Sequence, residues 1–446
     1  MTQPVSPEII LGLNPLWLSS GIFLATYALL ISERVNRTVA VMFGAGLMIT
    51  SGIINQDDAF DGVDFNTISL LAGMMILVGI TQRTGVFQYV AVWVVKKARA
   101  NPRGILVMLA TVTAVFSAFF DNVTTVLLIV PVTLLIVEKL EVSPYPYLFA
   151  EIFSSNIGGT ATLIGDPPNI MIGSAVGLSF SDFISELGPV VICIHLTVLL
   201  LLYLCWGRQL KSSEEARTRV MAFDERDSIT NPLLLRQSMA VMTLVIIGFV
   251  LGEHVGLRSG SIALGGAALL MLIYTFGRDS KEQAARVEEV LAELEWSTIL
   301  FFMCLFMMVH GLQFSGVLDL LGQHLVEFTD GDLQATTFAT LWLAAFASAV
   351  LDNVPFVATM IPVLQSIAPH LGGPEDMAPV WWALSLGACL GGNGTLVGAT
   401  ANIIVAGFAE RAGYRIGFGR FLLIGMPVLL LSVLIATGYL YLRHFA

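Results

Sequence analysis

Carboxylate and amide side chains occur together at two related places inside apolar stretches of this sequence. An Asp-Asn-Val tripeptide stands at residues 121–123 and again at residues 352–354, and a proline follows each copy, at Pro131 and Pro362. Charged and amide groups at membrane depth are costly unless they line a cavity or are buried in protein. A carboxylate can bind a proton or a cation, and an amide can bind a hydroxyl group. The two copies therefore predict one shared site for a small solute or ion.

A segment rich in glycine and threonine follows each Asp-Asn motif, at residues 156–169 and 391–402. Glycine and proline in these segments predict that a membrane helix unwinds, which exposes carbonyl oxygens and a positive helix N-terminus to a ligand. The predicted binding residues are Asp121, Asn122, Thr124, Thr125, Asn156, Gly159, Thr160, Thr162, Asp166, Asn169, Asp352, Asn353, Asn393, Thr395, Thr400 and Asn402.

The two copies are alike in shape but differ in charge. Asp166 in the first copy aligns with Ala399 in the second, and Asn156 aligns with Cys389. We therefore expect Asp121 and Asp166 to bind or release a coupling cation, with Asp166 the less replaceable of the two. The predicted site contains three carboxylates and no basic residue.

Each motif also has a purely structural interpretation. Asp121 and Asp352 could cap the N-termini of helices, and the glycines could form a packing face between helices. The packing face would not explain the threonine and asparagine side chains. Glu151, His195 and His310 are further, weaker candidates for a proton relay.

Two other classes of protein could also use these residues. An aspartyl protease built on Asp121 and Asp352 needs two carboxyl groups in near contact that share a proton. It would also leave the glycine- and threonine-rich segments without a purpose, so no enzymatic activity is expected. A passive channel is the other alternative, and a coupling measurement separates it from a carrier.

The composition excludes a soluble globular protein, because 56% of the residues are hydrophobic and only 12% are charged. Two long apolar runs, 104–137 and 334–367, contain the Asp-Asn motifs and predict re-entrant hairpins. Segments 84–97 and 314–327 are predicted interfacial helices. Ten further runs of about 20 residues predict membrane spans: 10–31, 38–54, 66–81, 147–176, 188–206, 237–252, 260–276, 296–312, 379–408 and 421–442.

The distribution of basic residues predicts the orientation in the membrane. Of the 22 Lys and Arg residues, all but Arg258 and Arg443 fall in alternate loops between the predicted spans, Arg37 among them. The positive-inside rule then places both termini outside and the loop 207–236 in the cytoplasm, in a multi-pass plasma (inner) membrane protein. The net charge of −11 lies mostly in loops and implies no nucleic-acid partner. All four cysteines fall in apolar spans, so neither disulfides nor a three-cysteine arsenic site is expected, and no metal or cofactor is predicted.

Landmarks in the two halves keep a constant offset, as Thr67 does with Thr298 and Asp121 with Asp352. We therefore predict an all-α polytopic membrane protein of two inverted repeats. Each repeat has five transmembrane helices and one re-entrant hairpin, with broken helices at the midplane. The predicted division is 1–206 for the first repeat, 207–236 for a cytoplasmic linker and 237–446 for the second repeat.

The motifs carry a resemblance over most of residues 30–440. Residues 121–125 and 158–169 resemble the ArsB/NhaD permease family of the ion transporter superfamily, and residues 389–395 closely resemble its branch that includes the melanosomal P protein. More distantly, the chain is similar to the divalent anion/sodium symporters, although aspartate here replaces the serine of their Ser-Asn-Thr hairpin tips. The resemblance implies a site made of hairpin tips and unwound helices, movement of a transport domain against a scaffold, and a homodimer.

These observations predict a secondary active transporter of a small inorganic solute or ion in the lipid bilayer. The first hypothesis is proton-coupled efflux of arsenite or antimonite as the neutral trihydroxide, which suits carboxylate, amide and hydroxyl partners. The alternatives are a sodium/proton antiporter and a cation-coupled transporter of organic anions such as dicarboxylates. The expected coupling ion is H⁺, with Na⁺ as the second candidate.

Overall fold

The computed structural model describes residues 12–32, 34–222 and 228–446, and all regular secondary structure in them is helical. Residues 10 and 11 of the first predicted span and residues 223–227 of the predicted linker lie outside the described residues. The first half contains α1 (Pro15–Ser32), α2 (Arg37–Thr50), α3 (Gln56–Asp61), α4 (Phe65–Gln82), α5 (Val86–Lys97), α6 (Pro102–Phe119), α7 (Asn122–Lys139), α8 (Tyr145–Gly159), α9 (Pro167–Val176) and α10 (Phe180–Trp206).

The second half repeats this order after the linker helix α11 (Glu214–Met221). Its helices are α12 (Pro232–Leu251), η3 (Gly252–Val255), α13 (Ser259–Thr275), α14 (Ser280–Ala292), α15 (Trp296–Phe314), α16 (Val317–Phe328), α17 (Leu333–Val350), α18 (Asn353–Ile367), η4 (Ala368–His370), α19 (Ala378–Gly391), α20 (Thr400–Arg411) and α21 (Phe418–His444).

Nine helices in the described part of the chain are long and apolar enough to cross a membrane, namely α1, α4, α6, α7, α10, α12, α15, α17 and α21. Helices α2, α13 and α19 are apolar but shorter. The predicted runs 147–176 and 379–408 are each divided into two helices, α8 with α9 and α19 with α20. The predicted all-α membrane fold with broken helices is confirmed.

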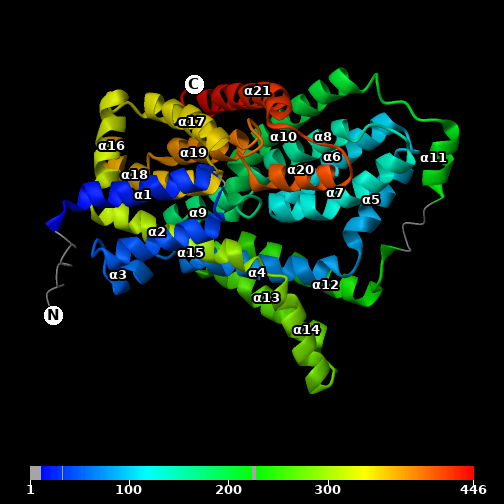
Figure 1. Cartoon of the computed structure of the whole chain (residues 1–446), viewed down its shortest axis with the longest axis horizontal. Helices are drawn as coiled ribbons and strands as arrows, with labels where there is room; N and C mark the ends of the chain where they lie inside the picture. The colour runs from blue at the N-terminus through cyan, green and yellow to red at the C-terminus, as the bar shows by residue number, and fades with distance from the viewer. Residues whose placement is uncertain (1–11, 33, 223–227) are drawn as a thin grey trace.

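The Asp-Asn motifs form the tips of two helical hairpins, α6–α7 and α17–α18. Phe120 and Asp121 have extended backbone between the arms of the first hairpin, and Leu351 and Asp352 have it in the second. In Figure 1, α6 and α7 lie toward the right and α17 and α18 toward the left, so the hairpins approach the middle from opposite ends. The amphipathic helices α5 and α16 likewise lie at opposite ends, as expected for inverted repeats.

The helices pack in two groups. Helices α1, α2, α4, α12, α13 and α15, here called the peripheral bundle, pack mainly on one another, with α4 against α13 and α2 against α15. The two hairpins, the broken helices and α10 and α21 form the hairpin bundle, in which α6 packs on α8 and α17 on α19. Except for α1, which lies level with α7 and α9, the peripheral bundle occupies the lower part of Figure 1 and the hairpin bundle the upper part.

Close helix contact explains the glycines at the ends of α8 and α19. A Cβ on Gly158 would lie 2.1 Å from the carbonyl oxygen of Ala114, and one on Gly391 would lie 2.6 Å from that of Ala345. Both distances are shorter than any real contact of this kind, so glycine lets each broken helix touch the backbone of a hairpin arm. The packing interpretation of these glycines is therefore correct, but it concerns backbone contact and leaves the polar side chains to be explained.

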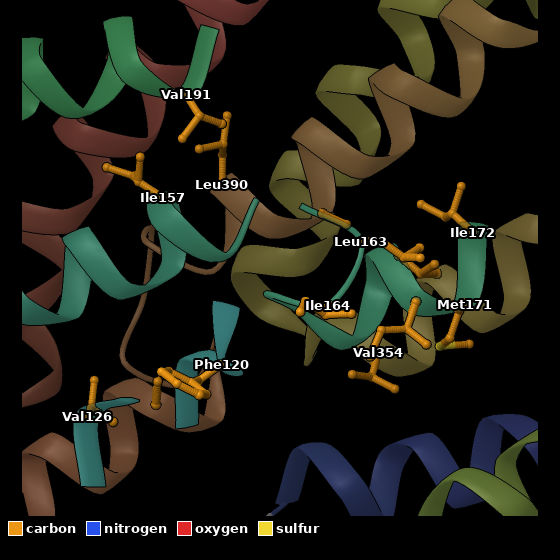
Figure 2. Packing of buried hydrophobic residues seen from close by; sticks show 14 of the residues in the cluster. Phe120, Val126, Ile157, Leu163, Ile164, Met171, Ile172, Val191, Val354 and Leu390 are labelled. Carbon is orange, nitrogen blue, oxygen red and sulfur yellow. The ribbon is translucent and has the colours of Figure 1, made fainter. Parts of the chain in front are cut away.

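Apolar side chains anchor the unwound segment between α8 and α9. Leu163 and Ile164 are 3% exposed and belong to the same buried cluster as Met171 of α9 and Val354 of the second hairpin, as Figure 2 shows. Burial of these side chains stabilises a stretch of chain that has no regular helix of its own. The segment therefore holds its polar residues in fixed positions.

Candidate binding site

The tips of both hairpins meet at one carboxylate. The Asn122 side-chain amide donates to Asp166 Oδ2 at 3.4 Å, and the Asn353 amide donates to Asp166 Oδ1 at 3.2 Å. Each hairpin thus supplies one donor, and each oxygen of Asp166 accepts one of them. Because Asp166 is 1% exposed, these amides replace water around a buried carboxylate.

Asp166 differs from the two other motif aspartates in its local role. Asp121 accepts a hydrogen bond from the Thr124 backbone N at 2.8 Å, and Asp352 accepts one from the Val354 backbone N at 3.3 Å. These two carboxylates therefore do cap helix N-termini, as the structural interpretation predicted. Asp166 precedes α9 but makes no such bond, because the first two residues of α9 are prolines without an N–H group and the Asn169 backbone N donates to the Asp166 carbonyl instead.

A chain of asparagines continues the network away from Asp166. The Asn156 side-chain oxygen accepts from Asn122 at 3.3 Å, and its amide donates to Asn393 at 3.0 Å and to Asn402 at 3.1 Å. All four residues are buried. Both unwound segments and the first hairpin are therefore connected through Asn156, which has a cysteine as its counterpart in the second half.

A cavity of about 60 Å³, here called the central cavity, lies beside this network. It is lined by both hairpin tips, both unwound regions, the start of α2, α4 and α15. Six of the predicted site residues line it: Asp121, Asn122, Asp166, Asp352, Asn353 and Thr400.

The prediction that the site has no basic residue is wrong. Arg37 lines the central cavity, and its Nη1 lies 3.2 Å from Asp352 Oδ2 and 2.6 Å from Thr400 Oγ1. The sequence placed Arg37 at the end of a loop, whereas the structure makes it the first residue of α2. One signal was available: α2 is short for a span, so its first residue need not reach the membrane surface.

Two further residues of the site, a fourth carboxylate and an aromatic ring, were not predicted from the sequence. Glu295 lines the central cavity and accepts a hydrogen bond from Thr298 at 2.9 Å. Phe301, which follows Thr298 by one turn of α15, lines the cavity as well. These residues lie in or beside an apolar run without a polar motif, so their spacing gave no indication of a site.

Several predicted binding residues instead hold the unwound segments. Asn169 donates to the Thr162 carbonyl at 2.9 Å, and Asn402 donates to the Thr395 carbonyl at 2.9 Å. Thr162 and Thr395 in turn donate to backbone carbonyls in the adjacent hairpins. Thr160 bonds to the carbonyl of its own helix at 2.8 Å. These side chains replace the backbone hydrogen bonds that unwinding removes.

The remaining predicted residues share no single role. The Thr124 hydroxyl bonds to Asp121, and a Cβ on Gly159 would lie 2.5 Å from the Gly165 carbonyl oxygen. The Thr125 hydroxyl and the Asn393 amide are buried and have no hydrogen-bond partner among the described residues. Buried polar atoms of this kind are the ones a bound ion or solute could satisfy.

The alternative proton relays lie outside the lining of the central cavity. Glu151 is buried in α8 and accepts a hydrogen bond from Thr133 at 2.5 Å. His195 lies on α10 and His310 on α15, where it packs beside Gly62. Of the two aspartates weighed as a dyad, Asp352 forms an ion pair with Arg37, and Asp121 accepts a hydrogen bond from the Thr124 backbone N.

Comparison with known proteins finds a matching family and several similar transporters. A family model described as a citrate transporter (CitMHS) matches residues 27–387. The chain is 40% identical over 428 residues to an uncharacterized transporter of Mycobacterium bovis, covering 95% of this chain and 97% of that protein. It is 33% identical over 511 residues to the P protein of Homo sapiens, covering 96% of this chain and 60% of the P protein.

The fold is similar to one of known structure. The YdaH transporter of Alcanivorax borkumensis matches with a TM-score of 0.62 at 14% identity, over 96% of this chain and 98% of that one. The sequence resemblance to the P-protein branch is confirmed by the identity above, while the likeness to ArsB/NhaD permeases stays a resemblance.

Proposed function

The chain belongs to the citrate transporter family, and on that premise we propose that this secondary transporter couples solute movement to a cation that binds at Asp166. The observation that carries the proposal is the pair of amides, one from each hairpin, that donate to the two oxygens of Asp166. Hydrogen bonds to an ionised acceptor are about twice as strong as neutral ones. Loss of the negative charge on Asp166 would therefore weaken the hold on both hairpin tips at once.

The proton is the coupling ion that this arrangement favours, with Na⁺ as the second candidate. A proton on one oxygen of Asp166 removes the negative charge and turns that oxygen into a hydroxyl, which is a weaker acceptor for the amide that donates there. One protonation event would thus weaken the contact with the Asn122 tip or with the Asn353 tip. This gives a direct physical link between cation binding and movement of a hairpin.

For the substrate, a small neutral polyhydroxyl solute remains the first candidate, with arsenite or antimonite trihydroxide as the example. The central cavity of about 60 Å³ suits a solute of few atoms. Carboxylates, amides and the Thr400 hydroxyl offer partners for hydroxyl groups. Four carboxylates face a single guanidinium there, so a multiply charged anion would require bound cations first.

Arg37 gives one specific reason to retain an organic anion as the second candidate. A guanidinium is the preferred partner of a carboxylate, and the matching family model carries the description of a citrate transporter. An anion of this kind would compete with Asp352 for Arg37 while cations occupy the other carboxylates.

The test uses purified protein in liposomes with an imposed pH gradient. Arsenite, antimonite, sodium and citrate are offered in turn, and solute and proton fluxes are measured together. We expect the metalloid to exchange for protons, and an inside-negative potential to drive its export, because a neutral solute leaves while a proton enters. Proton-driven sodium movement without metalloid flux would establish the antiporter instead, and cation-dependent citrate uptake would establish the organic-anion carrier. Solute flux that no gradient can drive uphill would contradict coupling altogether.

A further inference from the structure

Three side chains form a closed set of polar contacts that joins α2 to the tip of the second hairpin and the start of α20. Arg37 Nη1 donates to Thr400 Oγ1 at 2.6 Å and to Asp352 Oδ2 at 3.2 Å, and the Thr400 hydroxyl lies 3.3 Å from the same Asp352 oxygen. We call these three residues the Arg37 clasp. Each member contacts the other two, so displacing one of them weakens the whole set.

The clasp connects the two helix bundles. Arg37 begins α2 of the peripheral bundle, and its guanidinium lies over the ring of Phe301 on α15, 5.6 Å from the ring centre. Asp352 and Thr400 belong to the hairpin bundle, at the tip before α18 and at the start of α20. A movement of the second hairpin relative to α2 must therefore break the clasp.

The clasp also lies in the wall between two cavities. Beside the central cavity is a second one of about 300 Å³, here called the vestibule. The vestibule is bounded by α1, the tip of the second hairpin and α20. Arg37, Phe301 and Asp352 line both cavities. Their shared position makes them the partition between the larger space and the binding site.

The side chains of the clasp are partly accessible. That of Arg37 is 37% exposed and that of Asp352 is 25% exposed, whereas Asp166 is 1% exposed. A solute in the vestibule could therefore reach the clasp before it reaches Asp166.

We propose that Arg37 is a gating residue, whose contacts with Asp352 and Thr400 close the path from the vestibule to the central cavity. The proposal rests on the proposed function, since a gate has meaning only for a transporter. A solute passes when Arg37 leaves Asp352, and an anion that pairs with Arg37 or a cation that binds Asp352 favours that step. The difference in charge between the two halves is then explained, because Asp352 holds the gate closed and Asp166 binds the coupling ion.

The test measures access to the central cavity directly. Val123, which lines that cavity, is replaced by cysteine in a protein whose four native cysteines are replaced by alanine. The rate of modification by a small methanethiosulfonate is then measured in liposomes without any transported solute. Arg37→Gln should raise this rate by about tenfold or more, because a hydrogen bond to a charged group contributes more than a neutral one.

The matched control is Arg34→Gln, which removes the same charge three residues earlier at an exposed position. It should leave the modification rate unchanged. Arg37→Lys, which keeps a charge and a donor, should stay close to the unmodified protein. If Arg37→Gln does not fold, Thr400→Val carries the test and should raise the rate by a smaller factor. An unchanged rate in the folded variant, Arg37→Gln or Thr400→Val, would overturn the gate.

This readout separates the gate from the proposed function. Modification of residue 123 does not depend on which solute is carried or on its coupling ion. A gate that opens in Arg37→Gln, together with unaltered pH dependence in Asp166→Asn, would leave the gate standing and remove Asp166 from coupling. Normal coupling through Asp166, together with an unchanged modification rate in Arg37→Gln, would leave the proposed function standing and overturn the gate.

Discussion

The two halves of the molecule share their neutral hydrogen bonds and differ in their charges. Ser117 donates to the Ser155 carbonyl at 2.6 Å in the first half, and Ser348 donates to the Ala388 carbonyl at 2.6 Å in the second. These bonds hold each hairpin against its broken helix in the same way. Neutral, repeated contacts of this kind maintain the fold, because their partners are internal to each half.

The charged residues follow no such symmetry. Asp166 has an alanine as its counterpart, and Arg37 pairs with Asp352. Asp121, the counterpart of Asp352, accepts hydrogen bonds from Thr124 instead. A repeat that is duplicated in shape but not in charge can bind a cation in one half and control access in the other. The difference between the halves is therefore where we expect function to be found.

The largest effect should come from Asp166→Asn. The new amide places a donor where Asn122 or Asn353 already donates, and it cannot be protonated in the relevant range. We expect coupled transport to fall by roughly two orders of magnitude, the scale seen when a buried hydrogen-bonded charge loses its role. Flux at several pH values in liposomes checks this.

The control for this change is Asp57→Asn, which removes an exposed carboxylate from α3. It should transport normally. Coupled flux in Asp166→Asn with the same pH dependence as the original protein would remove Asp166 from the mechanism and with it the contrast between the halves.

A second, smaller effect compares the two hairpin tips. Asp121→Asn should reduce transport more than Asp352→Asn, because Asp352 shares its charge with Arg37 whereas Asp121 is available to the coupling ion. We expect about tenfold for Asp121→Asn and a few-fold for Asp352→Asn, in the range that loss of one charge-assisted bond produces. Adding Arg37→Gln to Asp352→Asn should cause little further loss, since the two residues act together. Equal losses at both tips would contradict the division of roles.

Much of the fold was predictable from the sequence, because its signals are local. The lengths of the apolar runs predicted the membrane spans, and glycine and proline predicted the helix breaks after Gly159 and Gly391. Glycine is required there because a side chain would prevent the contact between backbones. The meeting of Asp166 with both hairpin tips followed from the duplication of the motifs. Those inferences needed only spacing and residue type.

Arg37 could not be placed in the same way. A basic residue between two apolar runs normally marks a membrane surface, and the ion pair with Asp352 joins residues 315 positions apart in the chain. Glu295 is a similar case, since its position beside the cavity depends on how α15 packs. Contacts between the bundles depend on tertiary packing, which the pattern of a single segment does not contain.

The smallest effect tests the shared framework. Thr162 and Thr395 occupy equivalent positions and each donate to a hairpin carbonyl, of Ala118 and Ala349 respectively. Valine has nearly the same shape but lacks the hydroxyl, so each substitution leaves one carbonyl without its donor. Thr162→Val and Thr395→Val should each lower the free energy of unfolding by about 1 kcal/mol, the usual contribution of one such bond.

Thermal unfolding in detergent measures the stability of both variants, with Thr111→Val on the exposed face of α6 as the control. Equal losses of stability in the two variants would support a hydrogen-bonded framework that is symmetric between the halves, although their charges differ. A large loss of stability in one variant alone would show that the two halves also differ in what stabilises their folds.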